Sequence, residues 1–344
     1  MFFASDNAGP AHPKVMEALL AANEGHARPY GNDDLSEQAA RAIRALFEAP
    51  EASVHLVATG TAANALCLAA LTPPWGTAFC ADLAHVEEDE CNAPEFFSGG
   101  AKLSPVDTTD ARITPEALEA ALRRRPRGDV HVPQPAALTL TQATERGTLY
   151  TLGQIEALAA TARAHGLPVH MDGARFANAC AALGCTPAEM TWKAGIDAVS
   201  FGGTKNGLLG VEAVVFFDPA REWEIALRRK RAAHLFSKHR YLAAQMLAYL
   251  HEDLWLHTAR AANAKAARLA DGLRACPEIA LTHRPEVNMI FARLTPALHA
   301  HLQEAGAVYS AIEAADGTVT ARFVTDWSLP DTEIDRFLAL LQQG

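Results

Sequence analysis

One lysine of this chain is placed unusually for a charged residue. Lys205 lies in the segment Ser-Phe-Gly-Gly-Thr-Lys-Asn-Gly (200–207), within an otherwise uncharged stretch that spans residues 199–211. Burial disfavours an ammonium group and lowers its pKa, which is what a lysine needs to form a Schiff base with an aldehyde. The alternative is a lysine on a surface loop, which would normally have polar neighbours. The pattern therefore favours a reactive amine.

A carboxylate stands at the end of another apolar run. Asp172 directly follows the expected strand 168–171 and precedes Gly-Ala-Arg (173–175). In open parallel sheets, ligands bind beyond the carboxyl ends of the strands. Asp172 there is placed to hold a cationic ring nitrogen, to bind a metal or to act as a base. The structural alternatives are a helix cap and an ion pair with Arg175.

Two further segments have a chemical and a structural interpretation each. Thr-Gly-Thr (59–61) follows an apolar run and opens a helical stretch, so that Gly60 and Thr61 could present backbone N–H groups to an anion; an ordinary turn is the alternative. His85 precedes the acidic run 87–90, which is typical of a solvated helix face, and could equally be a structural histidine.

Taken together, these four segments meet the needs of pyridoxal phosphate. That cofactor requires an anion site, an acid for its pyridine nitrogen and an amine for its aldehyde. The chain supplies them in the order turn, histidine, strand-end aspartate and lysine, which is the order in enzymes of the aspartate-aminotransferase fold.

The elements that must position these residues follow an α/β pattern. Apolar runs at 54–57, 136–141, 168–171, 198–201 and 213–217 predict strands, and amphipathic stretches at 61–71, 152–165 and 187–194 predict helices between them, with another beginning near Thr114. The pattern predicts a mostly parallel sheet flanked by helices. Beyond residue 220 we expect one long helix at 222–258, another at 259–275 and short strands at 287–294 and 319–324.

We therefore expect three parts along the chain. Residues 1–20 are an N-terminal segment that contributes to the site, residues 21–235 form a large cofactor-binding domain, and residues 236–344 form a smaller C-terminal α+β domain. The uncharged run 52–81 is long enough to span a bilayer, but its polar and proline residues favour a helix buried in a soluble core.

Composition excludes several classes of protein. The 344 residues include 30 Lys and Arg against 40 Asp and Glu, a net charge of −10, which argues against a nucleic-acid partner. The six cysteines lack metal-site spacing, so we expect free thiols, no metal and a cytoplasmic protein.

The chain resembles the low-specificity L-threonine aldolases, closest to the bacterial branch that includes phenylserine aldolases. The resemblance extends over nearly the whole chain and rests on four strings: Tyr-Gly-Asn-Asp (30–33), Ala-Pro-Glu-Phe-Phe-Ser (93–98), His-Met-Asp-Gly-Ala-Arg-Phe-Ala-Asn-Ala (170–179) and the lysine segment 200–207. It implies pyridoxal 5′-phosphate, the type I fold of enzymes that use this cofactor, and cleavage of L-threonine, L-allo-threonine or phenylserine to glycine and an aldehyde. The alternative is β-elimination by another lyase of the same fold.

The resemblance also implies a role for each matching residue. Lys205 matches the Schiff-base lysine, Asp172 the partner of the pyridine nitrogen, His85 the histidine stacked on the ring, and Gly60 with Thr61 the phosphate site. The substrate-side residues are Arg175, Arg322, Ser5 and His131. Of these, Arg175 and Arg322 match arginines near the cofactor hydroxyl and the substrate carboxylate, Ser5 helps hold that carboxylate, and His131 matches a histidine near the substrate hydroxyl.

Two implications concern the proton acceptor and the assembly. His131 is the first candidate for the base, with His85 second. Many relatives have Glu-Asn-Thr-His after the central strand, whereas this chain has Thr-Gln-Ala-Thr-Glu (141–145), so that later histidine is missing. The resemblance further implies a homotetramer or homodimer with shared sites, in which Lys230 or Lys238 reaches a neighbour's phosphate site.

Overall fold

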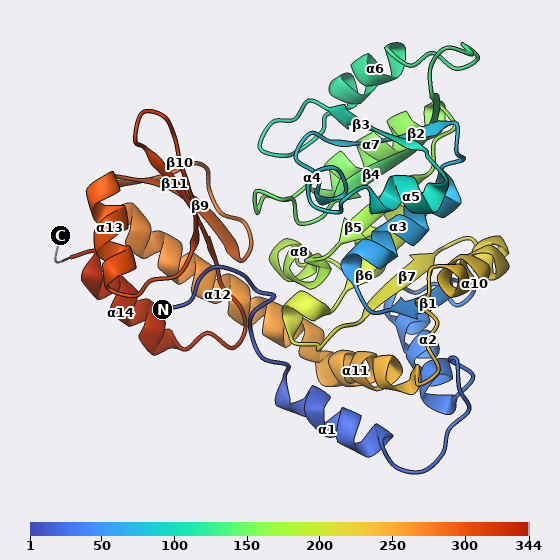
Figure 1. Ribbon diagram of the computed structural model, residues 1–344, viewed down its shortest axis with the longest axis horizontal. Coiled ribbons are helices and arrows are strands. Elements are labelled where there is room, and N and C mark those ends of the chain that lie inside the picture. The colour runs from blue at the N-terminus through green and yellow to red at the C-terminus, as the bar shows by residue number, and fades with distance from the viewer. Residues whose placement is uncertain (343–344) are drawn as a thin grey trace.

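Apolar runs in the first two thirds of the chain form a seven-stranded sheet. The computed structural model describes residues 1–342 and has a large and a small lobe (Figure 1). In spatial order the strands are β1 (Ser53–Val57), β7 (Glu212–Phe216), β6 (Ala198–Gly202), β5 (Val169–Gly173), β4 (Gln134–Thr141), β2 (Gly76–Ala81) and β3 (Lys102–Val106). β7 is antiparallel to β1 and β6, and the pairs from β6 to β3 are parallel. The predicted fold class is confirmed.

Helices cover this sheet because their apolar faces need a partner. They are α1 (Pro13–Ala22), α2 (Asp34–Leu46), α3 (Gly60–Leu71), α4 (His85–Glu88), α5 (Ala93–Ser98), α6 (Pro115–Arg123), α7 (Leu152–Ala164), α8 (Phe176–Leu183), α9 (Pro187–Met190), α10 (Glu222–Arg231) and α11 (Arg240–Leu250). Single-turn 3-10 helices lie at Trp192–Ala194, Thr204–Asn206, Pro219–Arg221 and His251–Asp253. The run 52–81 folds as β1, α3 and β2, and α3 is buried from Ala62 to Leu71. No helix within residues 1–342 is long and apolar enough to cross a membrane.

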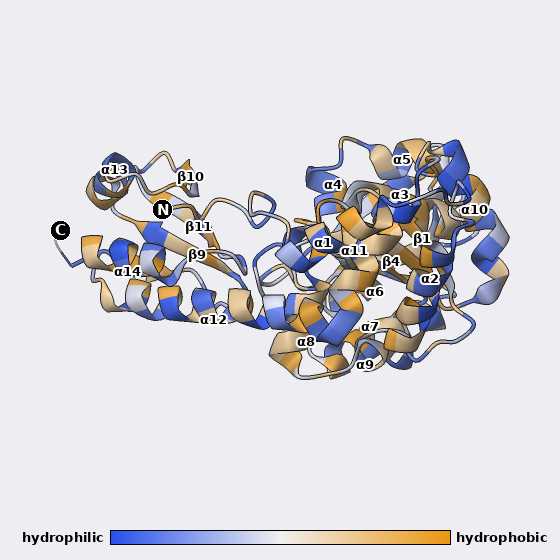
Figure 2. Ribbon diagram, turned by 90° about the horizontal axis from the view of Figure 1, so that it is seen from below, coloured by the Kyte–Doolittle hydropathy of each residue, from blue (hydrophilic) through white to orange (hydrophobic). Residues whose placement is uncertain are grey.

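The small lobe is an antiparallel sheet packed against helices. Its elements are α12 (Leu254–Ala275), β8 (Ile279–Leu281), β9 (Met289–Leu294), α13 (Pro296–Glu304), β10 (Ser310–Glu313), β11 (Val319–Val324) and α14 (Asp331–Leu340), with strand order β10-β11-β9-β8. Figure 2 shows the lobes from below, with α12 running along the small one.

The division between the lobes lies later than residue 235. The hydrophobic core of the large lobe still includes Met246, Trp255 and Ala259, whereas the core of the small lobe begins at Ala266. The reason is that α11 packs against α1 and α2 of the large lobe, so the boundary falls within α12. The N-terminal segment connects both lobes, because Phe3 lies in the core of the small one.

The expected long helix 222–258 is broken into three pieces. α10 ends at Arg231, and Ala233 then adopts a φ of 64°. A second break separates α11 from α12, where Glu252 and Asp253 have φ values of 51° and 54°. Both breaks redirect the chain, so that α11 lies on the large lobe and α12 extends to the small one (Figure 1).

Candidate active site

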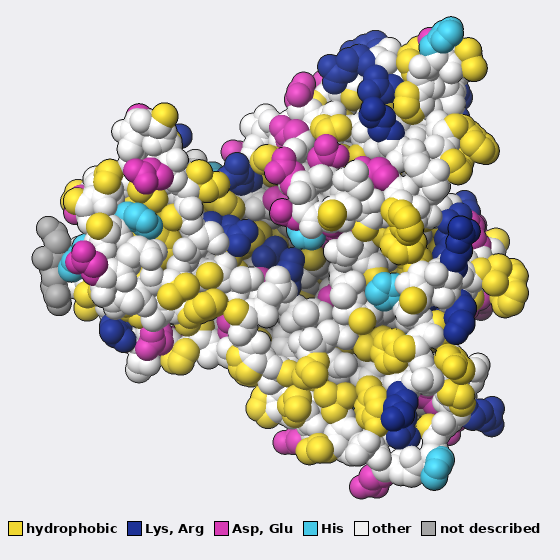
Figure 3. All heavy atoms as spheres, in the orientation of Figure 1, with side chains coloured by type: hydrophobic (Ala, Val, Ile, Leu, Met, Phe, Trp, Pro, Cys, Tyr) yellow, Lys and Arg dark blue, Asp and Glu magenta, His cyan; other side chains and the backbone are white. Residues whose placement is uncertain are grey.

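Most of the predicted site residues meet in one cavity of about 420 Å³. It lies where β4, β5 and β6 end and α3 begins, which is the edge that the parallel topology predicts for a ligand. Among its lining residues are Gly60, Thr61, His85, Asp172, Arg175 and Lys205. Figure 3 shows that the molecule is hollowed between the two lobes and that basic side chains gather there.

Lys205 lies on the short 3-10 helix that follows β6. Burial, and then the nearby charge of Arg175, lower its pKa, while Asp6, Asp172 and Glu212 act in the opposite direction. A lysine with a lowered pKa is more often the neutral amine that attacks an aldehyde. Its placement in the cavity fits a reactive lysine better than a surface loop residue.

A chain of buried hydrogen bonds connects Asp172 with His85. Asn64 Nδ2 donates to Asp172 Oδ2 at 2.8 Å and to Glu90 Oε1 at 2.9 Å. The same Glu90 oxygen lies 2.8 Å from His85 Nδ1. This contact is the main reason why the pKa of His85 is raised, against the effect of burial. The network fixes both the aspartate and the histidine ring in the cavity.

Arg175 pairs with Asp6 and not with Asp172. Its Nε and Nη2 donate to Asp6 Oδ2 and Oδ1 at 2.7 and 2.9 Å, and Asn288 Nδ2 donates to Oδ2 at 3.0 Å. Burial alone would raise the pKa of Asp6, but Arg175, Lys205 and these hydrogen bonds hold that pKa below its ordinary value. The sequence-based reasoning missed Asp6, whose partner is 169 residues away.

Ser5 and Arg322 lie beside the cavity and do not line it. Arg322 Nη2 donates to the carbonyl of Ala4 and to Ser310 Oγ, both at 3.3 Å, and its Nε is buried with no partner among residues 1–342. Burial and the charge of Arg175 lower the pKa of Arg322. Arg322 is therefore close to the Arg175–Asp6 pair, and its buried Nε has no partner among the described residues.

His131, which the sequence places near the substrate hydroxyl, lies far from the cavity of its own chain. It lies exposed in the loop ahead of β4, where its backbone N–H donates to Asp129 Oδ1 at 2.9 Å. β4 reaches the cavity at its other end, at Thr141. A strand of this length separates the two ends by on the order of 25 Å. His131 cannot reach a substrate in the cavity of its own chain.

The turn that opens α3 is built to leave backbone atoms accessible. Thr59 Oγ1 accepts a hydrogen bond from Ala62 N at 3.2 Å and so caps the helix. A Cβ added at Gly60 would meet no atom of the described residues within 4 Å. The glycine therefore faces open space at a helix N-terminus, where an anion is favoured.

Two carboxylates of the cavity were not assigned roles from the sequence. Glu145, in the string that departs from many relatives, accepts hydrogen bonds at Oε1 from His85 N at 3.0 Å and Thr141 Oγ1 at 2.7 Å. Glu212 Oε2 accepts from Gly203 N at 2.9 Å, and burial raises its pKa to about 7. An acidic residue soon after a buried strand was the available signal for Glu145, as it was for Asp172.

The chain is similar to several known proteins over most of its length. A family model described as beta-eliminating lyase matches residues 3–296. The low-specificity L-threonine aldolase of Pseudomonas aeruginosa is 44% identical, and the match covers 97% of this chain and 94% of that protein. The low-specificity L-threonine aldolase of Pseudomonas sp. (strain NCIMB 10558) is 41% identical, and the match covers 98% of this chain and 96% of that protein. A solved structure of the threonine aldolase of Leishmania major is 28% identical, with a TM-score of 0.94, and the match covers 99% of this chain and 98% of that one.

Proposed function

Because the chain belongs to the beta-eliminating lyase family and, within it, to the low-specificity L-threonine aldolases, we propose that it cleaves L-threonine and related L-3-hydroxy amino acids to glycine and an aldehyde. The related substrates include allo-threonine and phenylserine, and the cofactor is pyridoxal 5′-phosphate. The observation that carries the proposal is that Lys205, Asp172 and the Gly60 turn line one cavity.

The residues of the cavity fit this cofactor. The open space at Gly60, at the start of α3, suits the phosphate, and the carboxylate of Asp172 suits the pyridine nitrogen. Lys205 supplies the amine for the aldehyde, and His85 lies in the same cavity for contact with the ring. When bound, pyridoxal phosphate takes up the electron pair that the substrate releases at its α-carbon.

The protein's own residues hold the charges that this chemistry requires. Asp172, fixed by Asn64 and by the N–H of Ala174 at 2.9 Å, keeps a proton on the pyridine nitrogen. We further propose that Arg322 binds the substrate carboxylate with Ser5 nearby, since its Nε has no partner within the described part of the chain. A fixed carboxylate orients the bond between the α- and β-carbons, and this orientation decides which bond breaks.

His85 fits an electrostatic role better than that of the proton acceptor. Its contact with Glu90 raises its pKa, so that the ring is more often protonated than a free histidine near neutral pH. A protonated ring cannot take the proton of the substrate hydroxyl. Glu90 instead fixes the ring at the wall of the cavity, where it would contact the bound cofactor.

The product assay tests the function directly. Purified protein with pyridoxal phosphate is given L-threonine, L-allo-threonine or L-phenylserine, and the products are identified. We expect glycine together with acetaldehyde or benzaldehyde. 2-Oxobutyrate and ammonia from L-threonine, without glycine, would instead establish β-elimination, the second candidate that the family description favours.

We also propose that the chain works as a homodimer or homotetramer with shared sites. Phe96 and Leu227 are exposed and line a groove of about 1030 Å³ beside α3, α5 and α10. Exposed apolar surface of this kind marks interaction sites. Light scattering on the active protein should give a multiple of 36.8 kDa, and an active monomer at micromolar concentration would reject the idea.

A further inference from the structure

We propose that Glu145 binds the 3-hydroxyl group of the amino-acid substrate and accepts its proton when the carbon–carbon bond breaks. This inference rests on the proposed function and deepens it, because it names the group that recognises the hydroxyl. It gives a chemical task to the carboxylate that ends the string Thr-Gln-Ala-Thr-Glu (141–145).

The two oxygens of this carboxylate differ in their surroundings. Oε1 already accepts two hydrogen bonds, from His85 N and Thr141 Oγ1. Oε2 is buried and has no hydrogen-bond partner among residues 1–342, although Glu145 lines the cavity. A buried oxygen without a donor is costly, so a donor is expected there. The hydroxyl of a 3-hydroxy amino acid is such a donor.

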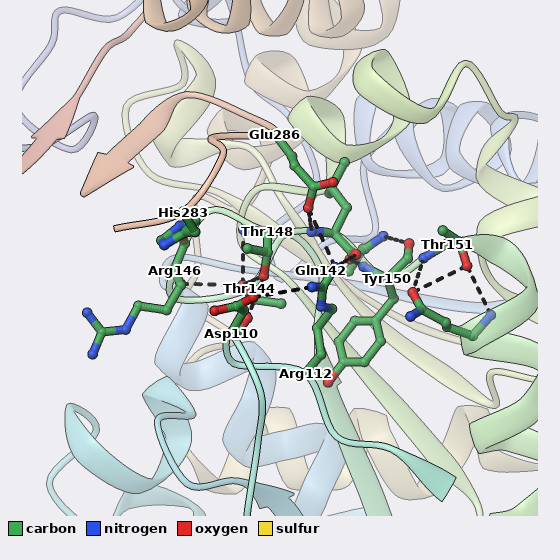
Figure 4. Close-up of polar contacts among 12 residues, drawn as sticks. Asp110, Arg112, Gln142, Thr144, Arg146, Thr148, Tyr150, Thr151, His283 and Glu286 are labelled. Atoms are coloured by element: carbon green, nitrogen blue, oxygen red, sulfur yellow. Dashed lines mark hydrogen bonds and ion pairs between the residues drawn. The ribbon is translucent and has the colours of Figure 1, made fainter. Parts of the chain in front are cut away.

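The loop that carries Glu145 is held rigidly from the small lobe (Figure 4). His283 Nε2 lies 2.6 Å from the carbonyl of Arg146, and the N–H of Leu149 donates to Glu286 Oε2 at 2.7 Å. The guanidinium of Arg146 also stacks on the ring of Phe291, 5.1 Å from its centroid. A group held in this way keeps its geometry through the reaction, which a proton acceptor needs.

The electrostatic surroundings support proton transfer at this position. Burial raises the pKa of Glu145, and the charge of Asp172 raises it further, while the hydrogen bonds from Thr141 and His85 act in the opposite direction. Its titratable neighbours also include Cys80 and Tyr150, and burial raises the pKa of each, which favours the neutral form. A carboxyl group whose pKa moves toward the working pH is an efficient acid–base catalyst.

The step balances as follows. The hydroxyl O–H bond breaks and its proton moves to Glu145 Oε2, while the oxygen forms the double bond of the aldehyde. The bond between the α- and β-carbons breaks and its electron pair stays with the α-carbon, where bound pyridoxal phosphate would stabilise it. The α-carbon then receives one proton as glycine forms, and Glu145 loses its proton to solvent, so that no other reactant is needed.

The rival explanation is that Glu145 only positions His85 through Oε1. Glu145→Gln separates the two, because the amide oxygen still accepts from His85 N but the side chain takes up no proton. The matched control is Glu119→Gln, which changes an exposed glutamate on α6 that contacts His165.

The experiment compares two reactions of the loaded enzyme. Cleavage of L-threonine involves the hydroxyl, whereas exchange of the α-proton of glycine in D2O, followed by NMR, does not. For Glu145→Gln we expect cleavage to fall by roughly a hundredfold to ten-thousandfold, as for loss of a general base, while glycine exchange and melting temperature stay near wild type. The decrease in kcat/KM that we expect for wild type toward acid pH should also be absent from Glu145→Gln.

Three results would overturn the proposal. Cleavage near the wild-type rate would show that Glu145 takes no proton, and an equal loss of both reactions would show that it acts through His85. If Glu145→Gln does not fold, Glu145→Asp must show the same split between the reactions, and its absence rejects the idea. Wild-type protein that forms no glycine from L-threonine would instead overturn the proposed function itself.

Discussion

Asp6→Asn should destabilise the protein strongly although residue 6 lies near the start of the chain. The substitution keeps the shape but removes the charge that receives two N–H groups of Arg175, at 2.7 and 2.9 Å. The side chains of this pair are only 1% and 12% exposed. Breaking a buried pair by removing one partner costs roughly 3–5 kcal/mol. Because the amide oxygen still accepts one hydrogen bond, we expect about 3 kcal/mol, near the lower end of that range.

The measurement is urea unfolding of wild type and variant under the same conditions. Glu37→Gln is the matched control, since it breaks an ion pair with Arg41 on the exposed surface of α2. Such a pair contributes less than about 1 kcal/mol. Equal unfolding midpoints for the two variants would refute the reasoning.

The pH dependence gives an independent check with a definite sign. The pKa of Asp6 is lower in the folded protein than its ordinary value of 3.8, so the charged form favours folding. The stability advantage of wild type over Asp6→Asn, measured as the difference in free energy of unfolding, should therefore be full above pH 3.8. It should disappear as the pH falls through the lower pKa that Asp6 has in the folded protein. An advantage that grew on acidification would contradict the assignment.

Three substitutions in the cavity test the proposed roles. Lys205→Ala should lose turnover and any borohydride-reducible linkage to the cofactor; a linkage at the wild-type level would show that another amine reacts. Asp172→Asn should bind the cofactor but lose activity, because it removes the charge-assisted hydrogen bond to the pyridine nitrogen, and such a bond contributes roughly 1.5–3 kcal/mol. A normal kcat in this variant would remove Asp172 from the mechanism. Arg322→Lys should lower kcat/KM about tenfold to a hundredfold at an unchanged melting temperature, because an ammonium lacks the planar fork. A large loss of stability with normal kcat/KM would assign Arg322 a structural role.

The order of elements could be predicted from the sequence where local patterns were strong. The runs at 54–57 and 198–201 are rich in apolar residues, and both became strands of the sheet. β2 was missed because Gly-Thr-Ala-Phe-Cys-Ala has few β-branched residues, and β3 because it contains Pro105, which suits an edge strand. The two breaks in the expected helix 222–258 occur without glycine or proline, so no residue there indicated them.

The candidate site could be predicted only where a residue adjoins its own strand. Asp172 lies at the carboxyl end of β5 and Lys205 three residues after the end of β6, so chain position alone indicates the carboxyl edge. The network of Asn64 and Glu90 is formed by tertiary contacts across the sheet edge, which no local pattern describes. The distance between His131 and the cavity of its own chain could not be predicted, because His131 precedes β4 and strand direction decides which end of a strand meets the cavity.

The contacts of Asp6 also determine when the site can be completed during synthesis. During synthesis Arg175 follows Asp6 by 169 residues, and Asn288 follows it by 282 residues. Contacts between residues so far apart form late, because the entropy of closing the intervening chain must first be offset. A nascent chain that ends before Asn288 can already contain all seven strands of the large sheet and Arg175, yet it lacks the second partner of Asp6. The set of contacts that hold Asp6 beside the cavity is therefore completed only when Asn288, just ahead of β9 in the small lobe, has been made.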